Sequence, residues 1–212
     1  MDNKQEQLDT LQQMRKLMEQ SSRFISLSGL AGVFVGIIAL AGGLVGYWYF
    51  DYSFYYPDYG YLVFDTSGEL LSEFLIFLFL NATAMLVLAL FIGTYLTIRK
   101  AKKKGLPMWD NVAKRMVINL FIPLAAGGVF ILTLLTQKQV ELVVPVTLIF
   151  YGLALINGSK YTLNDIRYLG IIQIILGLIC AYYNGYALLF WIMGFGILHI
   201  VYGLYLHFKY ER

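Results

Sequence analysis

Long apolar stretches without a single charged side chain constrain this chain more than any other feature. The last of them, residues 186–208, contains no Asp, Glu, Lys or Arg and is long enough to cross a bilayer, which takes about 20 apolar residues. Similar stretches cover residues 24–50, 74–98, 116–137, 142–159 and 168–183. Only 14% of the residues are charged, whereas a soluble domain has about 25%. The sequence therefore predicts an all-α membrane protein with six transmembrane helices.

Charged residues lie between the spans, and their sign alternates along the chain. The connection between the second and third spans is basic, with Asp110 as its one acidic residue. Residues 51–73, in contrast, contain five acidic residues and no Lys or Arg. Because cytoplasmic loops carry an excess of Lys and Arg, we expect the basic connections inside and the acidic one outside. The transmembrane domain, residues 24–212, then forms three in-out-in hairpins with both termini in the cytoplasm.

Residues 1–23 are polar but patterned. Their apolar side chains fall on one half of a helical wheel: Leu8, Leu11, Met14, Leu17 and Met18. This pattern predicts a short cytoplasmic amphipathic helix that lies on the membrane or packs under the bundle. The alternative is a parallel coiled coil that dimerises the protein, although it would have only about two heptads and would place Arg15 in its seam.

The acidic connection allows two interpretations. It could be a cation-binding or ligand-gating loop, or it could be a solvated outer loop with aromatic edges. Its acidic residues lack the regular spacing of oxygen ligands found in an EF-hand loop. We therefore expect a solvated loop.

Glycines mark helix faces that can pack closely. Gly29, Gly32 and Gly36 stack near one face of the first span, where small residues let helix backbones approach. The even-numbered spans also end alike, with a Gly in each of residues 91–96, 150–155 and 201–206. This similarity suggests a threefold repeat of hairpins, but membrane helices use a small alphabet and such matches also arise by chance. Mitochondrial carriers contain three hairpins too, yet their proline-acidic-basic signature is absent.

A few polar side chains interrupt the apolar spans in the half nearer to the basic connections. These candidate ligand-binding residues are Asn119, Gln173, His199, Tyr151, Tyr202 and Tyr95. If their faces converge, they form a polar, aromatic-lined pocket open to the cytoplasm, in which His199 could change charge between about pH 5 and 8. The alternative is that each residue, like Asn81, only joins neighbouring helices, at about 0.6 kcal/mol per hydrogen bond.

Several classes of activity are not supported by the sequence. No span contains a charged residue, which argues against a proton- or sodium-coupled pump and against a retinal protein. With His199 and His207 as the only histidines and Cys180 as the only cysteine, we expect no metal site, no disulfide and no cofactor. No catalytic motif is visible, so an intramembrane enzyme is the least favoured class. The basic residues are explained by topology, and no nucleic-acid partner is expected.

Three segments carry a resemblance to a known family. Residues 159–170 and 189–203, together with the start of the first span at Ser22–Phe24 and Leu27–Gly29, resemble a family of small bacterial inner-membrane proteins. The resemblance extends over most of the chain. It implies a bacterial inner-membrane location and assigns no activity.

The sequence favours a protein that binds or transports a small molecule through a cavity of the bundle. The alternative is a scaffold or regulatory subunit that assembles through its Gly-rich helix faces, as a homo-oligomer or with a membrane partner. The two hypotheses differ in where the polar side chains point. A binding protein needs them in one cavity, whereas a scaffold tolerates them at contacts between subunits.

Overall fold

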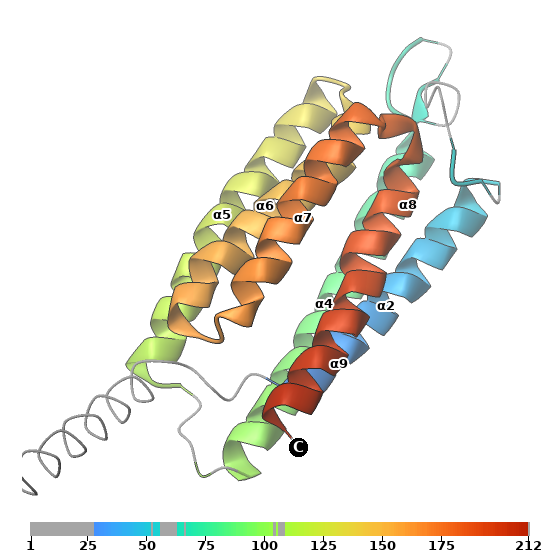
Figure 1. Ribbon diagram of the computed structural model, residues 1–212. Coiled ribbons are helices and arrows are strands. Elements are labelled where there is room, and N and C mark those ends of the chain that lie inside the picture. The colour runs from blue at the N-terminus through green and yellow to red at the C-terminus, as the bar shows by residue number, and fades with distance from the viewer. Residues whose placement is uncertain are drawn as a thin grey trace, which may run out of the picture.

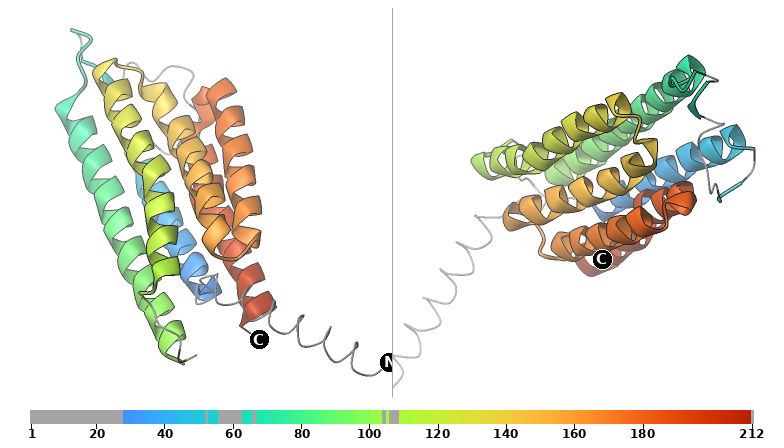
Figure 2. Two further views of the ribbon diagram at one scale, coloured as in Figure 1. Left: turned by 90° about the vertical axis from the view of Figure 1, so that its left-hand side faces the viewer. Right: turned by 90° about the horizontal axis from the view of Figure 1, so that it is seen from above.

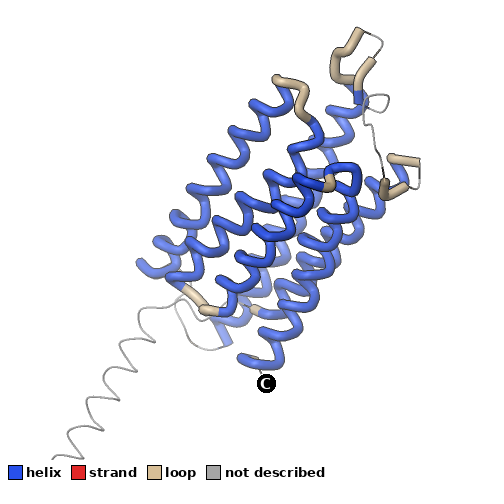
Figure 3. Tube along the Cα trace, turned by 45° about the horizontal axis from the view of Figure 1, so that its top comes forward, coloured by secondary structure: helices blue, strands red, loops and turns tan. Residues whose placement is uncertain are grey.

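A computed structural model describes most of the 212-residue chain. The described residues are 28–51, 53–55, 63–65, 67–103, 105 and 109–211. Helices make up nearly all of this part, and short loops join them (Figure 3). The amphipathic helix predicted over residues 1–23, the alternative coiled coil and the Ser22–Phe24 segment lie outside the described residues.

Each of the six predicted spans is a helix long and apolar enough to cross a membrane. The first five are α2 (Gly29–Tyr49), α4 (Ser72–Lys103), α5 (Asn111–Thr136), α6 (Val143–Gly158) and α7 (Asp165–Tyr182). The sixth changes its winding, from α8 (Ala187–Trp191) through the π-helical η4 (Ile192–Ile197) to α9 (Leu198–Tyr210). Short 3-10 turns precede or follow α6, α7 and α8: η1 (Val140–Leu142), η2 (Ser159–Tyr161) and η3 (Asn184–Tyr186). Within the described ranges, the predicted all-α fold with six helices of membrane-spanning length is confirmed.

The spans form two layers of three helices (Figures 1 and 2). In one layer α2 lies between α4 and the last span, and in the other α6 lies between α5 and α7. The first two hairpins, α2–α4 and α5–α6, each stay within a layer. The third hairpin is divided between the layers, because α7 packs against α6 while α9 packs against α2. The threefold repeat stays a prediction.

Glycines bring the helices within each layer close together. A Cβ atom added to Gly203 of α9 would lie 2.8 Å from the carbonyl oxygen of Gly29 in α2. In the other layer, a Cβ added to Gly152 of α6 would lie 2.6 Å from the carbonyl oxygen of Gly170 in α7. A side chain fits at neither position, so the close approach of these helices depends on glycine. The predicted small-residue face of α2 is thus used inside the chain, against α9.

The outside of the bundle is apolar, as lipid contact requires. Helix α4 shows this most clearly, since only Phe74 and Ala101 are buried along it. Leu80 and Phe91 expose 66% and 70% of their surface. An apolar surface of this extent marks contact with a membrane or a partner, and here it surrounds helices of membrane-spanning length.

The charged residues lie at the two ends of the bundle, and most of the Lys and Arg residues lie at one of them. One end, which we call the basic end, contains the C-terminus, the end of α4 and the start of α5 (Figure 1). Its described Lys and Arg residues are Arg99, Lys100, Lys102, Lys103, Lys114, Arg115, Lys160, Arg167 and Lys209. The described acidic residues at the opposite end are Asp51, Asp65, Glu69, Glu73 and Glu141, and Lys138 lies among them.

Two carboxylates hold the end of α9 in place at the basic end. Glu211 accepts hydrogen bonds from the backbone N–H of Gly29 at 2.7 Å, from Lys100 at 2.8 Å and from His207 at 2.6 Å. It therefore joins α9 to the N-terminus of α2, where a negative charge is favoured, and to α4. Asp165 at the start of α7 accepts hydrogen bonds from Lys209 at 3.0 Å and from the hydroxyl of Tyr210 at 2.6 Å. The C-terminal turn is thus bonded to both layers.

Candidate functional site

A cavity of about 260 Å³ lies between the two layers, near the basic end. All six spans contribute to its wall, and most of the lining side chains are apolar. Opposing walls are formed by Gly93 and Thr97 of α4, Met116 and Leu120 of α5, Tyr151 and Leu155 of α6, Leu169 of α7, and His199, Tyr202 and Leu206 of α9. We call it the Tyr–His cavity, because Tyr151 and His199 give it its main polar groups.

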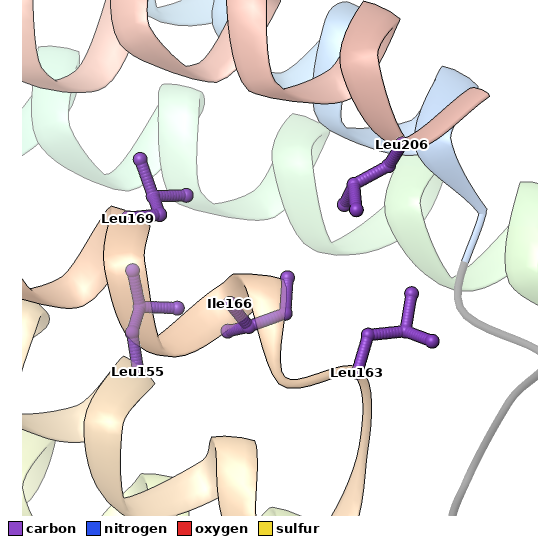
Figure 4. Packing of buried hydrophobic residues seen from close by; sticks show 5 residues of the cluster. All are labelled: Leu155, Leu163, Ile166, Leu169 and Leu206. Atoms are coloured by element: carbon purple, nitrogen blue, oxygen red, sulfur yellow. The ribbon is translucent and has the colours of Figure 1, made fainter. Parts of the chain in front are cut away.

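Apolar side chains from three segments form part of the cavity wall. Figure 4 shows Leu155, Leu163, Ile166 and Leu169 on one side and Leu206 of α9 on the other. Tyr151 and Tyr202 pack against the same cluster. Because the two groups of side chains come from different layers, the cluster joins the layers next to the cavity.

Tyr151 and His199 form a hydrogen-bonded pair in the cavity wall. The Tyr151 hydroxyl lies 2.7 Å from Nε2 of His199, and Nδ1 of His199 lies 2.9 Å from the carbonyl oxygen of Gly194. A carbonyl can only accept, so Nδ1 carries the proton in this arrangement. In the neutral ring Nε2 is then the acceptor, and the Tyr151 hydroxyl donates to it. A neutral histidine thus satisfies both contacts, and the Tyr151 oxygen then retains acceptor capacity.

Gln173 joins this pair through the same carbonyl group. Its Nε2 donates to the carbonyl oxygen of Gly194 at 2.7 Å. The side chain is fully buried, and its Oε1 has no hydrogen-bond partner among the described residues. The chain of bonds thus runs from Tyr151 through His199 and Gly194 to Gln173, and crosses from α6 through the last span to α7.

The π-helical segment Ile192–Ile197 positions the shared carbonyl. π-Helical turns are rare and occur frequently at functional sites. Glycine at position 194 also leaves room for the buried Gln173, since a Cβ there would lie 2.7 Å from Oε1 of Gln173. Sequence analysis did not identify Gly194 as part of the site. The Gly194–Phe195–Gly196 pattern was visible, but it does not by itself predict a π-helical turn.

The six predicted site residues are not all brought together. Tyr151, His199 and Tyr202 line the cavity, and Gln173 reaches it through Gly194. Tyr202 also donates to the backbone oxygen of Asp165 at 2.6 Å, which fixes its ring at the basic end of the cavity.

Asn119 and Tyr95 lie outside this cluster. Asn119 donates to the carbonyl oxygen of Arg115 in its own helix at 2.8 Å, and its backbone oxygen accepts from Asn157 at 2.7 Å. Tyr95 is on α4 with 56% of its surface exposed. The depth of a residue in its span could be counted from the sequence, but the direction of its side chain could not.

A second cavity, of about 280 Å³, lies between the layers towards the acidic end. Apolar and aromatic side chains dominate its lining, including Phe77 and Met85 of α4 and Trp191 of α8. Asn81 also lines it and donates to the carbonyl oxygen of Gly42 at 3.2 Å. Asn81 therefore joins α4 to α2, as predicted. Among its described lining residues, this cavity lacks a buried polar pair such as Tyr151 and His199.

Neither cavity shows a metal site. Among the described residues, no three His, Cys, Asp or Glu side chains group closely enough to hold an ion. Cys180 is buried and free. The chemistry available in the Tyr–His cavity is therefore that of neutral hydrogen-bonding groups in an apolar wall.

Comparison with known proteins found no match, so the function of this chain is argued from its structure. No protein family matches the chain, and neither the curated proteins nor the solved structures contain a match. The helices are those of a polytopic membrane protein. The resemblance to bacterial inner-membrane proteins stays an expectation from the sequence.

Proposed function

We propose that this protein binds a small apolar or weakly polar molecule in the Tyr–His cavity. One observation carries this proposal: Tyr151 and His199 present a hydrogen-bonded polar pair to a cavity of about 260 Å³ whose other walls are mostly apolar. Ligand sites typically combine an apolar lining with a few polar groups that fix orientation. An ionisable side chain within a membrane span is a functional-site hypothesis by default.

The cavity sets limits on its ligand. Its volume lies just below the range of about 300–1,000 Å³ that is common for ligand pockets, so it suits a small molecule or one apolar chain of a larger molecule. The Tyr151 hydroxyl donates to His199, which leaves its oxygen to accept a hydrogen bond from a ligand N–H or O–H. A ligand with one donor and an apolar body matches these walls.

We place the Tyr–His cavity on the cytoplasmic side of a bacterial inner membrane. The support is the gathering of Lys and Arg at the basic end, since cytoplasmic loops are enriched in these residues. Both termini are then cytoplasmic, as in the sequence-based prediction. Transport would require a route from this cavity to the second one, across the packed middle of the bundle.

A scaffold or regulatory role is the second candidate. Its original support was the Gly-rich face of α2. Gly29, Gly32 and Gly203 pack between α2 and α9 of the same chain, so this face is not available to another protein. An assembly surface would have to use the exposed apolar side chains of α4 instead.

The binding proposal can be tested with an apolar photolabel, an alkanol that carries a diazirine. The protein is reconstituted in lipid nanodiscs and labelled, and the modified peptides are mapped by mass spectrometry. We expect modification of Tyr151, Leu120 and other cavity residues. Label confined to lipid-facing residues such as Phe91 would contradict the proposal.

Two glycine variants provide a matched comparison for this experiment. A Cβ at Gly158 would lie 3.5 Å from Leu120 and point into the cavity, whereas a Cβ at Gly128 of α5 would meet nothing within 4 Å. Gly158→Leu should abolish labelling in the cavity, and Gly128→Leu should leave it unchanged.

His199→Ala separates a binding role from a packing role. If His199 serves the ligand, the variant should change the labelling pattern of the cavity in addition to any loss of stability. A variant that only lowers the unfolding temperature, with the labelling pattern retained, would assign His199 to packing alone.

A further inference from the structure

The second cavity combines an aromatic and aliphatic wall with one carboxylate. Among its described lining residues, Glu141 of η1 is the only one with a charged side chain. Helical positions three residues apart lie on the same face, so Glu141 is on the side of its span that also carries the lining residue Val144. The wall of this cavity therefore contains a single negative charge, at the acidic end of the bundle.

Glu141 has no positive partner within the described part of the chain. It takes part in none of the ion pairs found there. The nearby cation, Lys138, is bound elsewhere: its Nζ lies 2.7 Å from Oε1 of Glu69 and 2.7 Å from the carbonyl oxygen of Gly68. The other described charges at this end are acidic, and a surface with one sign of charge attracts ions of the other sign. The carboxylate is thus left for a cation from outside the chain.

The uncharged polar side chains of this wall also leave oxygen atoms as acceptors. The hydroxyl of Thr147 donates to the carbonyl oxygen of Val144 at 2.7 Å, and Nδ2 of Asn81 donates to the carbonyl oxygen of Gly42 at 3.2 Å. The side-chain oxygens of Thr147 and Asn81 can then still accept hydrogen bonds. An anionic ligand would meet no positive charge among the described lining residues.

Aromatic rings fixed by their neighbours lie in the same wall. Phe50, Phe77 and Trp191 line the cavity. Phe77 stacks on Tyr49 with ring centroids 3.8 Å apart and makes an edge contact with Phe50 at 6.4 Å. Trp191 packs against Phe195 with centroids 5.2 Å apart. The faces of aromatic rings attract cations, and tryptophan does so most strongly.

The size and ligand set of the cavity suit an organic cation. A Ca²⁺ or Mg²⁺ ion needs several oxygen ligands at short distance, whereas one carboxylate among apolar walls suits an ammonium group that carries alkyl or aryl substituents. The volume is about 280 Å³. Its lining residues on α4 extend from Phe74 to Met85, which is about 16 Å along the helix axis. An apolar body attached to the ammonium group fits this length.

We propose that the second cavity binds an organic cation, an alkylated ammonium with an aromatic or aliphatic body. The ammonium group lies between the carboxylate of Glu141 and the rings of Phe77 and Trp191, and the body extends along α4 towards Met85. The charge, the aromatic rings and the apolar walls each have a counterpart in such a ligand. This site is separate from the Tyr–His cavity, so the inference does not depend on the proposed function.

Equilibrium dialysis of the full chain in phosphatidylcholine nanodiscs tests the inference, with empty nanodiscs as the blank. Two probes differ only in their central atom: benzyltrimethylammonium is a cation, and neopentylbenzene is its uncharged carbon isostere. We expect the cation to bind about tenfold more tightly than the isostere, or better. Equal affinity for the two probes, or tighter binding of the isostere, would overturn the inference.

Two glutamates give a matched control for the charge. Glu141 and Glu73 both lie at the acidic end, but only Glu141 lines the cavity. Glu141→Gln should weaken binding of the cation by about tenfold and leave binding of the isostere unchanged, whereas Glu73→Gln should affect neither probe. Equal losses of cation binding in both variants would mean that the cation responds only to the net charge of this end, which contradicts the assigned site.

Tryptophan variants test the contact with the aromatic rings. Trp191→Leu should weaken binding of the cation by about fivefold and binding of the isostere by much less. Trp48→Leu is the control, because Trp48 exposes 63% of its surface and does not line the cavity; it should change neither affinity. An equal loss for cation and isostere in Trp191→Leu would show a packing role and overturn the placement of the ammonium group on this ring.

Two alanines of α4 test the position of the ligand body. Ala82 lies among the lining residues Leu78 and Met85 at helical spacing, whereas Ala84 is exposed and does not line the cavity. Ala82→Phe should weaken binding of both probes, and Ala84→Phe should weaken neither. Gly158→Leu, which fills the Tyr–His cavity, should leave cation binding unchanged. Loss of cation binding in Gly158→Leu with retention in Ala82→Phe would place the cation in the other cavity and overturn the inference.

Discussion

At the scale of single residues, His199 depends on groups from other helices. Its two ring nitrogens contact Tyr151 of α6 and Gly194 of its own span, and both contacts are satisfied by a neutral ring. The depth of His199 in the last span was evident from the sequence. Its partners could not be identified from the sequence. They are determined by the third hairpin, whose two helices lie in different layers, and by a π-helical turn, and no local sequence pattern indicated either feature.

Tyr151→Phe should destabilise the protein. The variant removes the hydroxyl that donates to Nε2 of His199 and leaves this buried nitrogen without a partner. Hydrogen bonds between membrane helices contribute about 0.6 kcal/mol on average and up to about 1.7 kcal/mol, so we expect a loss in this range. Thermal unfolding in detergent measures it. Tyr95→Phe, on the exposed side of α4, is the control and should leave the unfolding temperature unchanged.

At the scale of the helices, close packing in each layer depends on glycine pairs. Gly152→Ala should force α6 and α7 apart, because the added Cβ would lie 2.6 Å from the carbonyl oxygen of Gly170 and 2.7 Å from Ile174. Overpacking of this kind typically costs about 1–3 kcal/mol. The free energy of unfolding in a denaturant titration provides the measurement.

Gly128→Ala is the matched control for this substitution. Gly128 lies in the middle of α5, and a Cβ there meets nothing within 4 Å. Alanine favours helix over glycine by about 1 kcal/mol, so this variant should be as stable as the parent protein or more stable. Equal destabilisation by both substitutions would contradict the proposed role of the α6–α7 contact.

At the scale of the whole molecule, Glu211 joins the C-terminus to α2 and α4. Burial would raise the pKa of Glu211, but hydrogen bonds from Lys100, the Gly29 N–H and His207 outweigh this effect and lower the pKa to about 2. A carboxyl group whose pKa is lowered by folding stabilises the protein fully above its unfolded pKa. This contribution is lost as the pH falls towards the folded pKa.

Glu211→Gln should therefore reduce stability in a pH-dependent way. The difference in unfolding temperature between the parent protein and the variant should be largest above pH 4.5, the usual pKa of this group, and should shrink as the pH approaches 2. Glu69→Gln serves as control, because the Glu69–Lys138 pair is exposed and exposed pairs contribute little. A difference for Glu211→Gln that is independent of pH would contradict this assignment.

The orientation of the whole bundle is a further prediction. With the basic end in the cytoplasm, green fluorescent protein fused after residue 212 should fluoresce, and alkaline phosphatase fused there should be inactive. Alkaline phosphatase fused after residue 138, at the acidic end, should be active. The reverse pattern in a bacterial host would invert the proposed topology and would place the Tyr–His cavity on the outer side.

By itself, the sequence determined the number of helices, their approximate ends and the separation of charge between the two ends of the bundle. These properties are local, because the length of an uncharged stretch and the residues that flank it decide whether it can cross a bilayer. Only the tertiary structure decided that α9 packs against α2, that Asn119 and Tyr95 do not line the cavity, and that Gly194 connects His199 to Gln173. Such contacts depend on how the surfaces of distant segments fit together, and no single stretch of the chain contains that information.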